Sequence, residues 1–166
     1  MTTVYFGLGS NLGHRRRHIE RTLMALKPGV VIGAASGLYE TAPLYVTEQP
    51  AFLNAAARGE TALDPLDLLH FIKQLERDLG RVPTERYGPR LIDIDILFYG
   101  TQIVDLPYLT IPHPRMAERE FVLRPLNDVA ADFVHPVLNK TVAELLSVLT
   151  PDPAMKRLEQ KLGLGG

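Results

Sequence analysis

Apolar and β-branched residues occur in short runs that alternate with polar residues along the chain. This pattern predicts β-strands at residues 3–10, 30–41, 52–61 and 90–100. A Gly-Thr pair after the last run predicts a turn, and residues 102–106 are the expected hairpin partner of the strand at 90–100. Strands joined by short connections favour a mostly antiparallel sheet.

Segments in which apolar residues recur at helical spacing lie between these strands. Residues 10–29 carry apolar positions at helical intervals before a Pro-Gly stop. A second helix is expected from Asp64, a typical N-cap, to Gly80, a typical helix end. The sequence Thr-Val-Ala-Glu at 141–144 is a capping box and predicts a third helix. The tail, residues 150–166, is expected to be a frayed helix or a disordered end.

The order of these elements is β-α-β-β-α-β-β-α. It indicates an α+β sandwich in which helices cover a mostly antiparallel sheet. The chain has 166 residues, which is typical of one domain. It has no internal repeat and no linker long enough to separate two units, so we expect a single domain spanning residues 1–166.

Composition narrows the classes of function. The chain is 46% hydrophobic and 22% charged, and its formal net charge of −1 gives no global positive field to attract nucleic acid. Cysteine is absent, which excludes disulfides, thiolate nucleophiles and Cys-based zinc sites. We find no basic leader and no run of about 18 apolar residues. We therefore expect a cytoplasmic protein that binds neither nucleic acid nor membranes.

Two carboxylates interrupt the otherwise apolar strand at 90–100. Alternate residues of a strand point to the same face about 6.5–7 Å apart, so Asp93 and Asp95 project together. The alternating apolar residues from Ile92 to Phe98 are expected to face the core. Neighbouring carboxylates repel, and negatively charged oxygen ligands suit Mg²⁺, which completes its shell with water and phosphate oxygens. The alternative is a pair that faces solvent at a sheet edge or binds Arg.

Basic residues flank this Asp-x-Asp on both sides along the chain. They are Arg81, Arg86 and Arg90 upstream, and His113, Arg115 and Arg119 downstream. Each alone would more often be a surface charge. Around a metal-binding pair they suit a magnesium–polyphosphate complex, because guanidinium groups bind phosphate oxygens bidentately. The pattern favours phosphoryl-type transfer without a covalent intermediate.

A second site, for a flat ligand, is suggested by residues 41–56. Asn54 both donates and accepts hydrogen bonds, as the amide edge of a heterocycle requires. Phe52 and Phe121 can stack on the two faces of such a ring, although each aromatic residue is by itself more often part of a core.

Two other motifs are less specific. The glycines Gly7, Gly9 and Gly13 miss the dinucleotide fingerprint, because Leu12 stands where the third glycine is needed. A tight strand-to-helix turn is the preferred interpretation. The basic run at 14–18 lacks the interleaved aromatic residues that stack on RNA bases, so it favours a solvated helix face.

Taken together, these motifs resemble the 6-hydroxymethyl-7,8-dihydropterin pyrophosphokinase family of folate biosynthesis. The stretch YGPRLIDIDILFYG (87–100) is similar to the family signature. Further similar segments follow the family's order: GLGSNLG, YETAPL, QPAFLNAA, IKQLERDLGR and IPHPRMAEREFVLRPL. The resemblance extends from about residue 3 to residue 149.

The resemblance implies a ferredoxin-like α/β sandwich, a monomer and a specific reaction. Pyrophosphate would pass from ATP to 6-hydroxymethyl-7,8-dihydropterin, giving AMP and the pterin diphosphate. The pterin hydroxymethyl oxygen would attack the β-phosphorus of ATP. Asp93 and Asp95 match the family's carboxylates that hold two Mg²⁺ ions.

The resemblance also assigns roles to other positions. The pterin surroundings are matched by Thr41, Pro43, Leu44, Phe52, Asn54, Asp93 and Phe121. The phosphates and the catalytic centre are matched by Arg81, Arg90, His113 and Arg119. The nucleotide surroundings are matched by Glu76, Ile96 and Thr110, although Glu76 could equally be an exposed helical residue. Arg86 is the candidate to replace a phosphate contact where Pro83-Thr84 stand in place of another basic residue.

Two alternative functions belong to other classes of protein. A non-catalytic, RNA-binding α+β module is disfavoured by the net charge and by the absence of a basic, aromatic RNA-binding strand. A magnesium-dependent phosphotransferase acting on another heterocycle or alcohol would release ADP rather than AMP.

Overall fold

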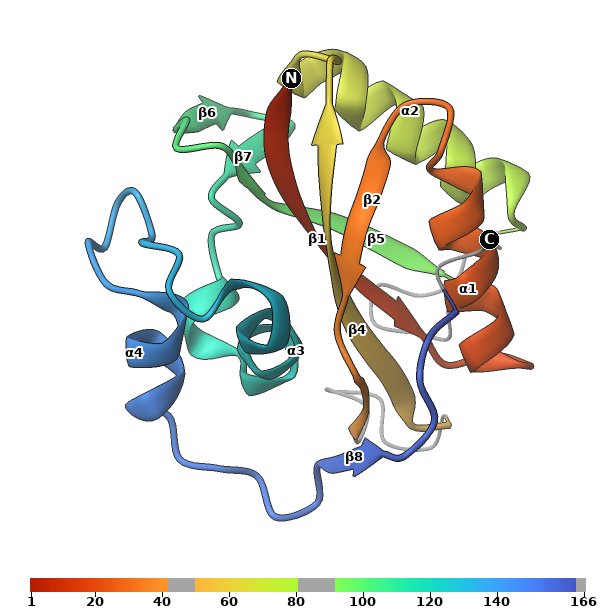
Figure 1. Cartoon of the computed structure of the whole chain (residues 1–166), viewed down its shortest axis with the longest axis vertical. Helices are drawn as coiled ribbons and strands as arrows, with labels where there is room; N and C mark the ends of the chain where they lie inside the picture. The colour runs from red at the N-terminus through yellow and green to blue at the C-terminus, as the bar shows by residue number, and fades with distance from the viewer. Residues whose placement is uncertain (42–49, 81–91, 164–166) are drawn as a thin grey trace.

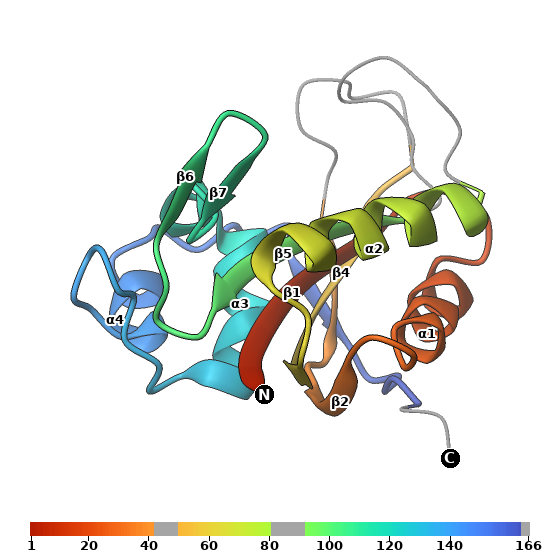
Figure 2. The same ribbon diagram turned by 90° about the horizontal axis from the view of Figure 1, so that it is seen from above.

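The computed structural model describes residues 1–41, 50–80 and 92–163. Its centre is a six-stranded sheet in the order β5-β1-β4-β3-β8, with β2 also paired to β4, and every pairing in it is antiparallel. Helices cover both faces of this sheet (Figures 1 and 2). The predicted α+β, ferredoxin-like sandwich with a mostly antiparallel sheet is therefore confirmed.

The elements have the following bounds. The long strands are β1 (Thr2–Ser10), β4 (Phe52–Thr61) and β5 (Asp93–Tyr99). The short strands of the same sheet are β2 (Val31–Ala35), β3 (Leu38–Thr41) and β8 (Lys156–Leu158). A separate hairpin is formed by β6 (Val104–Leu106) and β7 (Leu109–Ile111). The helices are α1 (Arg15–Ala25), α2 (Pro65–Asp78), the 3-10 turn η1 (Met116–Glu118), α3 (Glu120–Ala130) and α4 (Val142–Ser147).

One face of the sheet packs against α1 and α2. Ile19 and Leu23 lie four residues apart on α1, and Leu68 and Ile72 lie four apart on α2, so each pair forms an apolar stripe. All four side chains are buried against β1, β4 and β5. The Asp64 carboxylate accepts a bond from the backbone N–H of Asp67 at 2.8 Å and caps α2, as the sequence predicts.

The opposite face packs against α3 and α4. Leu123 and Leu126 of α3 and Leu145 of α4 are buried with Phe98 of the sheet. The capping box at the start of α4 is complete, because Thr141 and Glu144 each accept a bond from the other's backbone N–H. Two helical layers thus enclose the sheet, and the predicted third helix is confirmed.

Strand β5 changes face in its middle. Phe6 of β1 pairs with Ile96, but the preceding Tyr5 pairs with Phe98, so Leu97 is an extra residue that forms a β-bulge. Ile96 packs in the cluster under α1 and α2, whereas Phe98 packs in the cluster with α3 and α4. The prediction that all alternating residues from Ile92 to Phe98 share one face is therefore wrong at Phe98.

Three other expectations differ from the structure. Strand β6 pairs with β7 rather than with β5, so residues 102–106 are not the hairpin partner of the Asp-x-Asp strand. The run at 30–41 is divided into β2 and β3 at Ser36, whose Oγ accepts the N–H of Ala56 at 2.7 Å. The tail is not frayed throughout, because β8 pairs with the outer edge of β3. Within the described ranges, no helix is long and apolar enough to cross a membrane.

Candidate active site

A row of four residues crosses the sheet on the same face as α3. Asp93 lies opposite Gly9, Gly9 lies opposite Asn54, and Asn54 lies opposite Tyr39. Directly opposed residues of antiparallel strands share a face, so all four belong to one surface. This row brings together two predicted site residues, Asp93 and Asn54, that are 39 positions apart in the sequence.

Residues two positions away extend the same surface. Asp95 lies opposite Gly7 on the β5 side of the row, and Phe52 lies opposite Thr41 on the β3 side. Because residues i and i+2 of a strand share a face, Asp95, Phe52 and Thr41 join the row. The carboxylate pair and the predicted heterocycle contacts therefore lie on one side of the sheet. Asp95 is exposed and Asp93 is half-buried.

The glycines of β1 keep the space between the two halves of this surface open. Gly7 and Gly9 face the carboxylates from within the strand, so the interpretation of both as turn residues is wrong, and only Gly13, with φ 63°, occupies a turn conformation. A Cβ atom at Gly9 would lie 3.4 Å from Asn54 Oδ1 and 3.8 Å from Phe52 Cδ1. The sequence contains a signal for this arrangement. Gly7 and Gly9 are two residues apart, as are Asp93 and Asp95, so each pair lies on one face of its strand.

Asn54 is held in a fixed orientation. Its Nδ2 donates to Thr41 Oγ1 at 2.8 Å, and both residues are buried. One amide N–H and the Oδ1 acceptor of Asn54 remain to bind a ligand, which is the donor and acceptor pair that an amide-like ring edge needs. Asn54 and Thr41, which are both predicted to contact the heterocycle, are therefore joined by a hydrogen bond.

His113 is anchored beside β5. Its backbone N–H donates to the carbonyl of Leu97, the bulged residue, at 3.1 Å. Burial lowers the pKa of the His113 imidazole and the Arg119 charge lowers it further, while the Asp95 carboxylate acts in the opposite direction. The imidazole, Asp95 and Arg119 thus form one electrostatic group.

The N-terminus of α3 carries a cation and an aromatic ring side by side. Arg119 is the N-cap residue of α3, and its guanidinium carbon lies 5.6 Å from the centre of the Phe121 ring. This distance is typical of a cation–π contact. The two residues were assigned to different substrates from the sequence, and the structure places them in contact.

Glu76 is buried rather than exposed. Its side chain is 3% exposed, and Oε2 accepts the backbone N–H of Ile94 at 3.0 Å. Oε1 lies 3.2 Å from the Lys73 ammonium group. The alternative of a solvent-facing helical residue is therefore wrong, because Glu76 binds the outer edge of β5, the strand that carries the aspartates.

Ile96 and Thr110 lie at different depths. The Ile96 side chain is buried in the cluster under α1 and α2, on the face opposite the aspartates. Its backbone belongs to the same outer edge of β5 as the N–H that Glu76 binds, because the two positions are two residues apart. Thr110 lies on β7 and is exposed. Any contact of Ile96 with a nucleotide would therefore be made by its backbone.

Several predicted residues fall outside the described ranges: Pro43, Leu44, Arg81, Arg86 and Arg90. In the part of the chain that the structure describes, no group of three or more His, Asp or Glu side chains could hold a metal ion. The protein ligands that this part offers at the site are therefore the two carboxylates of β5.

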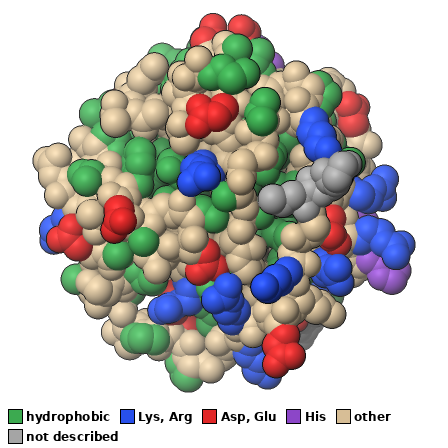
Figure 3. Space-filling model, viewed as in Figure 1, with side chains coloured by type: hydrophobic (Ala, Val, Ile, Leu, Met, Phe, Trp, Pro, Cys, Tyr) green, Lys and Arg blue, Asp and Glu red, His purple; other side chains and the backbone are tan. Residues whose placement is uncertain are grey.

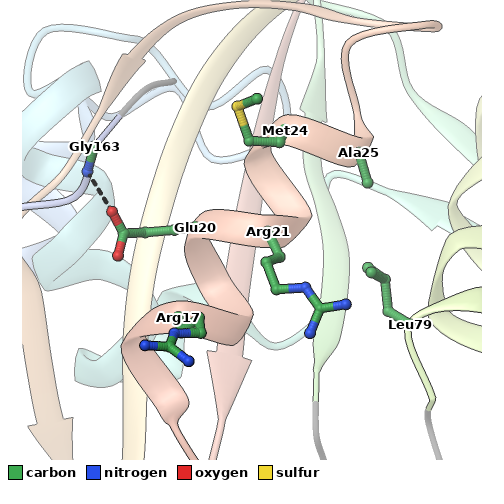
Figure 4. A pocket seen from close by; sticks show the side chains of 7 residues that line it. All are labelled: Arg17, Glu20, Arg21, Met24, Ala25, Leu79 and Gly163. Atoms are coloured by element: carbon green, nitrogen blue, oxygen red, sulfur yellow. Dashed lines mark hydrogen bonds between the residues drawn. The ribbon is translucent and has the colours of Figure 1, made fainter. Parts of the chain in front are cut away.

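A groove of about 620 Å³ lies on the other side of the molecule (Figure 4). It is lined by residues of α1, the end of α2 and the tail: Arg17, Glu20, Arg21, Met24, Ala25, Leu79 and Gly163. Glu20 accepts the backbone N–H of Gly163 at 2.9 Å, and Arg21 extends from α1 toward Leu79. Among the residues that the structure describes, none of the predicted site residues lines this groove.

Comparison with known proteins decides the family. The sequence model of 7,8-dihydro-6-hydroxymethylpterin-pyrophosphokinase (HPPK) matches residues 5–131, which is more than half of the chain. The chain belongs to the HPPK family. The resemblance inferred from the sequence motifs is therefore confirmed.

Curated relatives of this HPPK-family chain differ in length. It is 45% identical to the 2-amino-4-hydroxy-6-hydroxymethyldihydropteridine pyrophosphokinase of Pseudomonas aeruginosa, over 80% of this chain and 83% of that protein. It is 49% identical to the folic acid synthesis protein FOL1 of Dictyostelium discoideum, over 83% of this chain but 21% of that protein. A mitochondrial folate synthesis bifunctional protein of Arabidopsis thaliana is 45% identical over 96% of this chain and 28% of its own length. The chain thus spans less than a third of these two longer relatives.

Solved structures share the fold. Wild-type HPPK-DHPS of Plasmodium falciparum superimposes with a TM-score of 0.75 at 18% identity, over 94% of this chain and 48% of that one. At this identity the likeness supports the architecture alone.

Proposed function

We propose that this chain transfers pyrophosphate from ATP to 6-hydroxymethyl-7,8-dihydropterin, giving AMP and the pterin diphosphate. One observation carries the proposal: in a chain of the HPPK family, β5 presents Asp93 and Asp95 on the same face as the Asn54–Thr41 pair of β4 and β3. A polyphosphate bound at the carboxylates and a heterocycle bound at the amide would lie side by side on this surface. Such proximity is the main requirement for a transfer that passes through no covalent intermediate.

The donor set fits magnesium bound together with a nucleotide. Two carboxylates on one strand supply hard oxygen ligands, and the described residues add no third acidic or histidine ligand that would complete a protein cage. Water and phosphate oxygens would then fill the remaining positions, as Mg²⁺ prefers. Asp93 and Asp95 are thus the proposed residues to hold two Mg²⁺ ions, which would neutralise charge on the triphosphate.

The pterin would bind over the glycine surface of β1. Asn54 offers one N–H and Oδ1 to the amide edge of the ring, and the bond to Thr41 keeps the amide oriented. Phe52 borders this surface beside Gly9, and Phe121 at the start of α3 is the proposed second stacking partner. Because Gly9 has no side chain, the ring can approach the sheet closely.

The nucleotide would bind from the β5 side. The His113 imidazole interacts electrostatically with both Asp95 and Arg119, so His113 and Arg119 are the described candidates for binding phosphate oxygens. Arg81, Arg86 and Arg90 are the further proposed phosphate contacts. Glu76, the backbone of Ile96, and Thr110 are proposed to border the nucleoside along the outer edge of β5 and the adjacent hairpin.

The proposal is tested by incubating the chain with MgATP and 6-hydroxymethyl-7,8-dihydropterin and separating the nucleotide products. AMP should form in step with the pterin diphosphate, and metal chelation should stop the reaction. Release of ADP with no AMP would refute pyrophosphoryl transfer and favour a simple phosphotransferase.

A variant control links the activity to the β5 carboxylates. Asp95 is exposed, so Asp95→Ala should preserve the thermal unfolding midpoint while removing most of the turnover. Full activity in this variant would show that the AMP comes from elsewhere. We also propose that the protein acts as a cytoplasmic monomer. Sedimentation analysis of the active fraction tests its oligomeric state.

A further inference from the structure

Asp128 of α3 joins the helix to β3. Its carboxylate accepts the Tyr39 hydroxyl at 2.9 Å and the Gly37 backbone N–H at 3.0 Å. Burial of Tyr39 raises the pKa of its phenol to about 12, and the bond to Asp128 contributes to this rise. The hydroxyl therefore stays protonated and donates to the carboxylate throughout the physiological pH range.

The tail adds a third partner to this contact. Strand β8 pairs with β3 so that Arg157 lies opposite Tyr39, and the guanidinium carbon lies 5.5 Å from the centre of the tyrosine ring. An Arg157 nitrogen also lies 3.5 Å from the Asp128 carboxylate. A Cβ atom at Gly37 would come within 2.7 Å of the same guanidinium, so the glycine makes room for it. Lys and Arg side chains gather around β8 in the space-filling view (Figure 3).

These contacts fix the strand that carries the heterocycle site. Tyr39 lies opposite Asn54, and Thr41, which accepts the Asn54 bond, is two residues further along β3. β3 has only four residues, so few backbone bonds hold it in register. Residues 132–163, which include β8, lie beyond the 5–131 region matched by the family model.

We propose that Tyr39, Asp128 and Arg157 form a positioning clamp for the pterin site, which sets the alignment of β3 and thereby the orientation of the Thr41–Asn54 pair. This inference rests on the proposed function, because it assigns the clamp to the pterin rather than to ATP. A looser β3 would lower the fraction of molecules in the binding-competent arrangement and weaken apparent affinity in proportion. None of the three side chains needs to touch the substrate.

The test compares two variants that each remove one buried phenol oxygen. Tyr39→Phe removes the bond to Asp128, and Tyr99→Phe removes a 2.6 Å bond to the Leu63 carbonyl in the opposite face's cluster. Tyr39 and Tyr99 are almost equally buried, at 4% and 5% exposure. Tyr39→Phe should raise the pterin KM by about fivefold, corresponding to about 1 kcal/mol, and leave the ATP KM unchanged. Tyr99→Phe should change neither KM, although it also lowers the unfolding midpoint.

Hydrogen exchange provides a readout that does not require activity. Amides of the β3–β4 ladder, such as those of the opposed residues Tyr39 and Asn54, should exchange faster in Tyr39→Phe than in the wild type or in Tyr99→Phe. Equal exchange and equal pterin KM in the two variants would overturn the clamp while leaving the pyrophosphokinase proposal intact. A wild-type chain without AMP production would refute the proposed function, and faster β3–β4 exchange would then support only the structural part of the clamp. In that case the assignment of the clamp to the pterin would be overturned.

Discussion

Glu76 offers a test of what holds the aspartate strand at the edge of the sheet. Its carboxylate is the partner of the Ile94 N–H on the outer side of β5 and is also 3.2 Å from Lys73. Replacement by alanine leaves a buried backbone donor unpaired, which costs about 1–3 kcal/mol, and removes one methylene, worth about 0.8 kcal/mol. Glu76→Ala should therefore lower the free energy of unfolding by about 3 kcal/mol, or the thermal midpoint by about 6–12 °C.

The assay is urea and thermal unfolding of three variants beside the wild type. Glu76→Gln keeps an oxygen acceptor for the Ile94 N–H and should lose only about 1 kcal/mol. Lys73→Met removes the partly exposed end of the ion pair and should change stability by about 0.5 kcal/mol or less. If Lys73→Met were as destabilising as Glu76→Ala, the ion pair rather than the backbone bond would hold the strand. A loss below about 1 kcal/mol in Glu76→Ala would contradict the importance of both contacts.

Three further outcomes follow from other contacts. Asn54→Ala should weaken pterin binding, measured by calorimetry, more than ATP binding, and an equal loss for both would remove Asn54 from the pterin edge. Thr141→Ala breaks the capping box of α4 and should cost about 1 kcal/mol, or about 2–4 °C in a thermal melt. Burial lowers the pKa of His135, whose Nδ1 accepts two backbone N–H groups, so the unfolded chain binds more protons just below pH ~6.5. Stability should fall as the pH drops from about 7 to 5, and His135→Asn should reduce that slope in urea titrations.

Local patterns were enough to predict the architecture. Alternation and helix caps are short-range signals, and both Asp64 and Thr141 cap their helices as expected. The shared face of Asp93 and Asp95 also follows from strand geometry alone, since it depends only on residues two positions apart. Pairing partners are not local, and the sequence-based pairing of 102–106 with β5 failed because a three-residue strand carries little register information.

The composition of the site could be predicted only in part. Family resemblance supplied the residues, but it did not show that Glu76 is buried against the Ile94 N–H or that Arg119 contacts Phe121. These contacts depend on how α2 and α3 pack on the sheet. The β8 strand was missed because its three residues, Lys156–Leu158, lack the alternation that marks longer strands.

The bulge at Leu97 has an electrostatic consequence for its neighbour Asp95. The extra residue brings the Leu97 side chain within 3.6 Å of where a Gly7 Cβ would lie, and Gly7 is the residue opposite Asp95. Leu97 hydrocarbon thus occupies the space beside Gly7, on the same face of the sheet as the exposed Asp95. Because attraction between charges grows as the surrounding dielectric constant falls, this apolar neighbour would strengthen the attraction of Asp95 for the proposed metal ion. Leu97→Ser should therefore weaken cation binding without changing the metal ligands. Calorimetric titration with Mg²⁺ in the presence of a non-hydrolysable ATP analogue measures this effect.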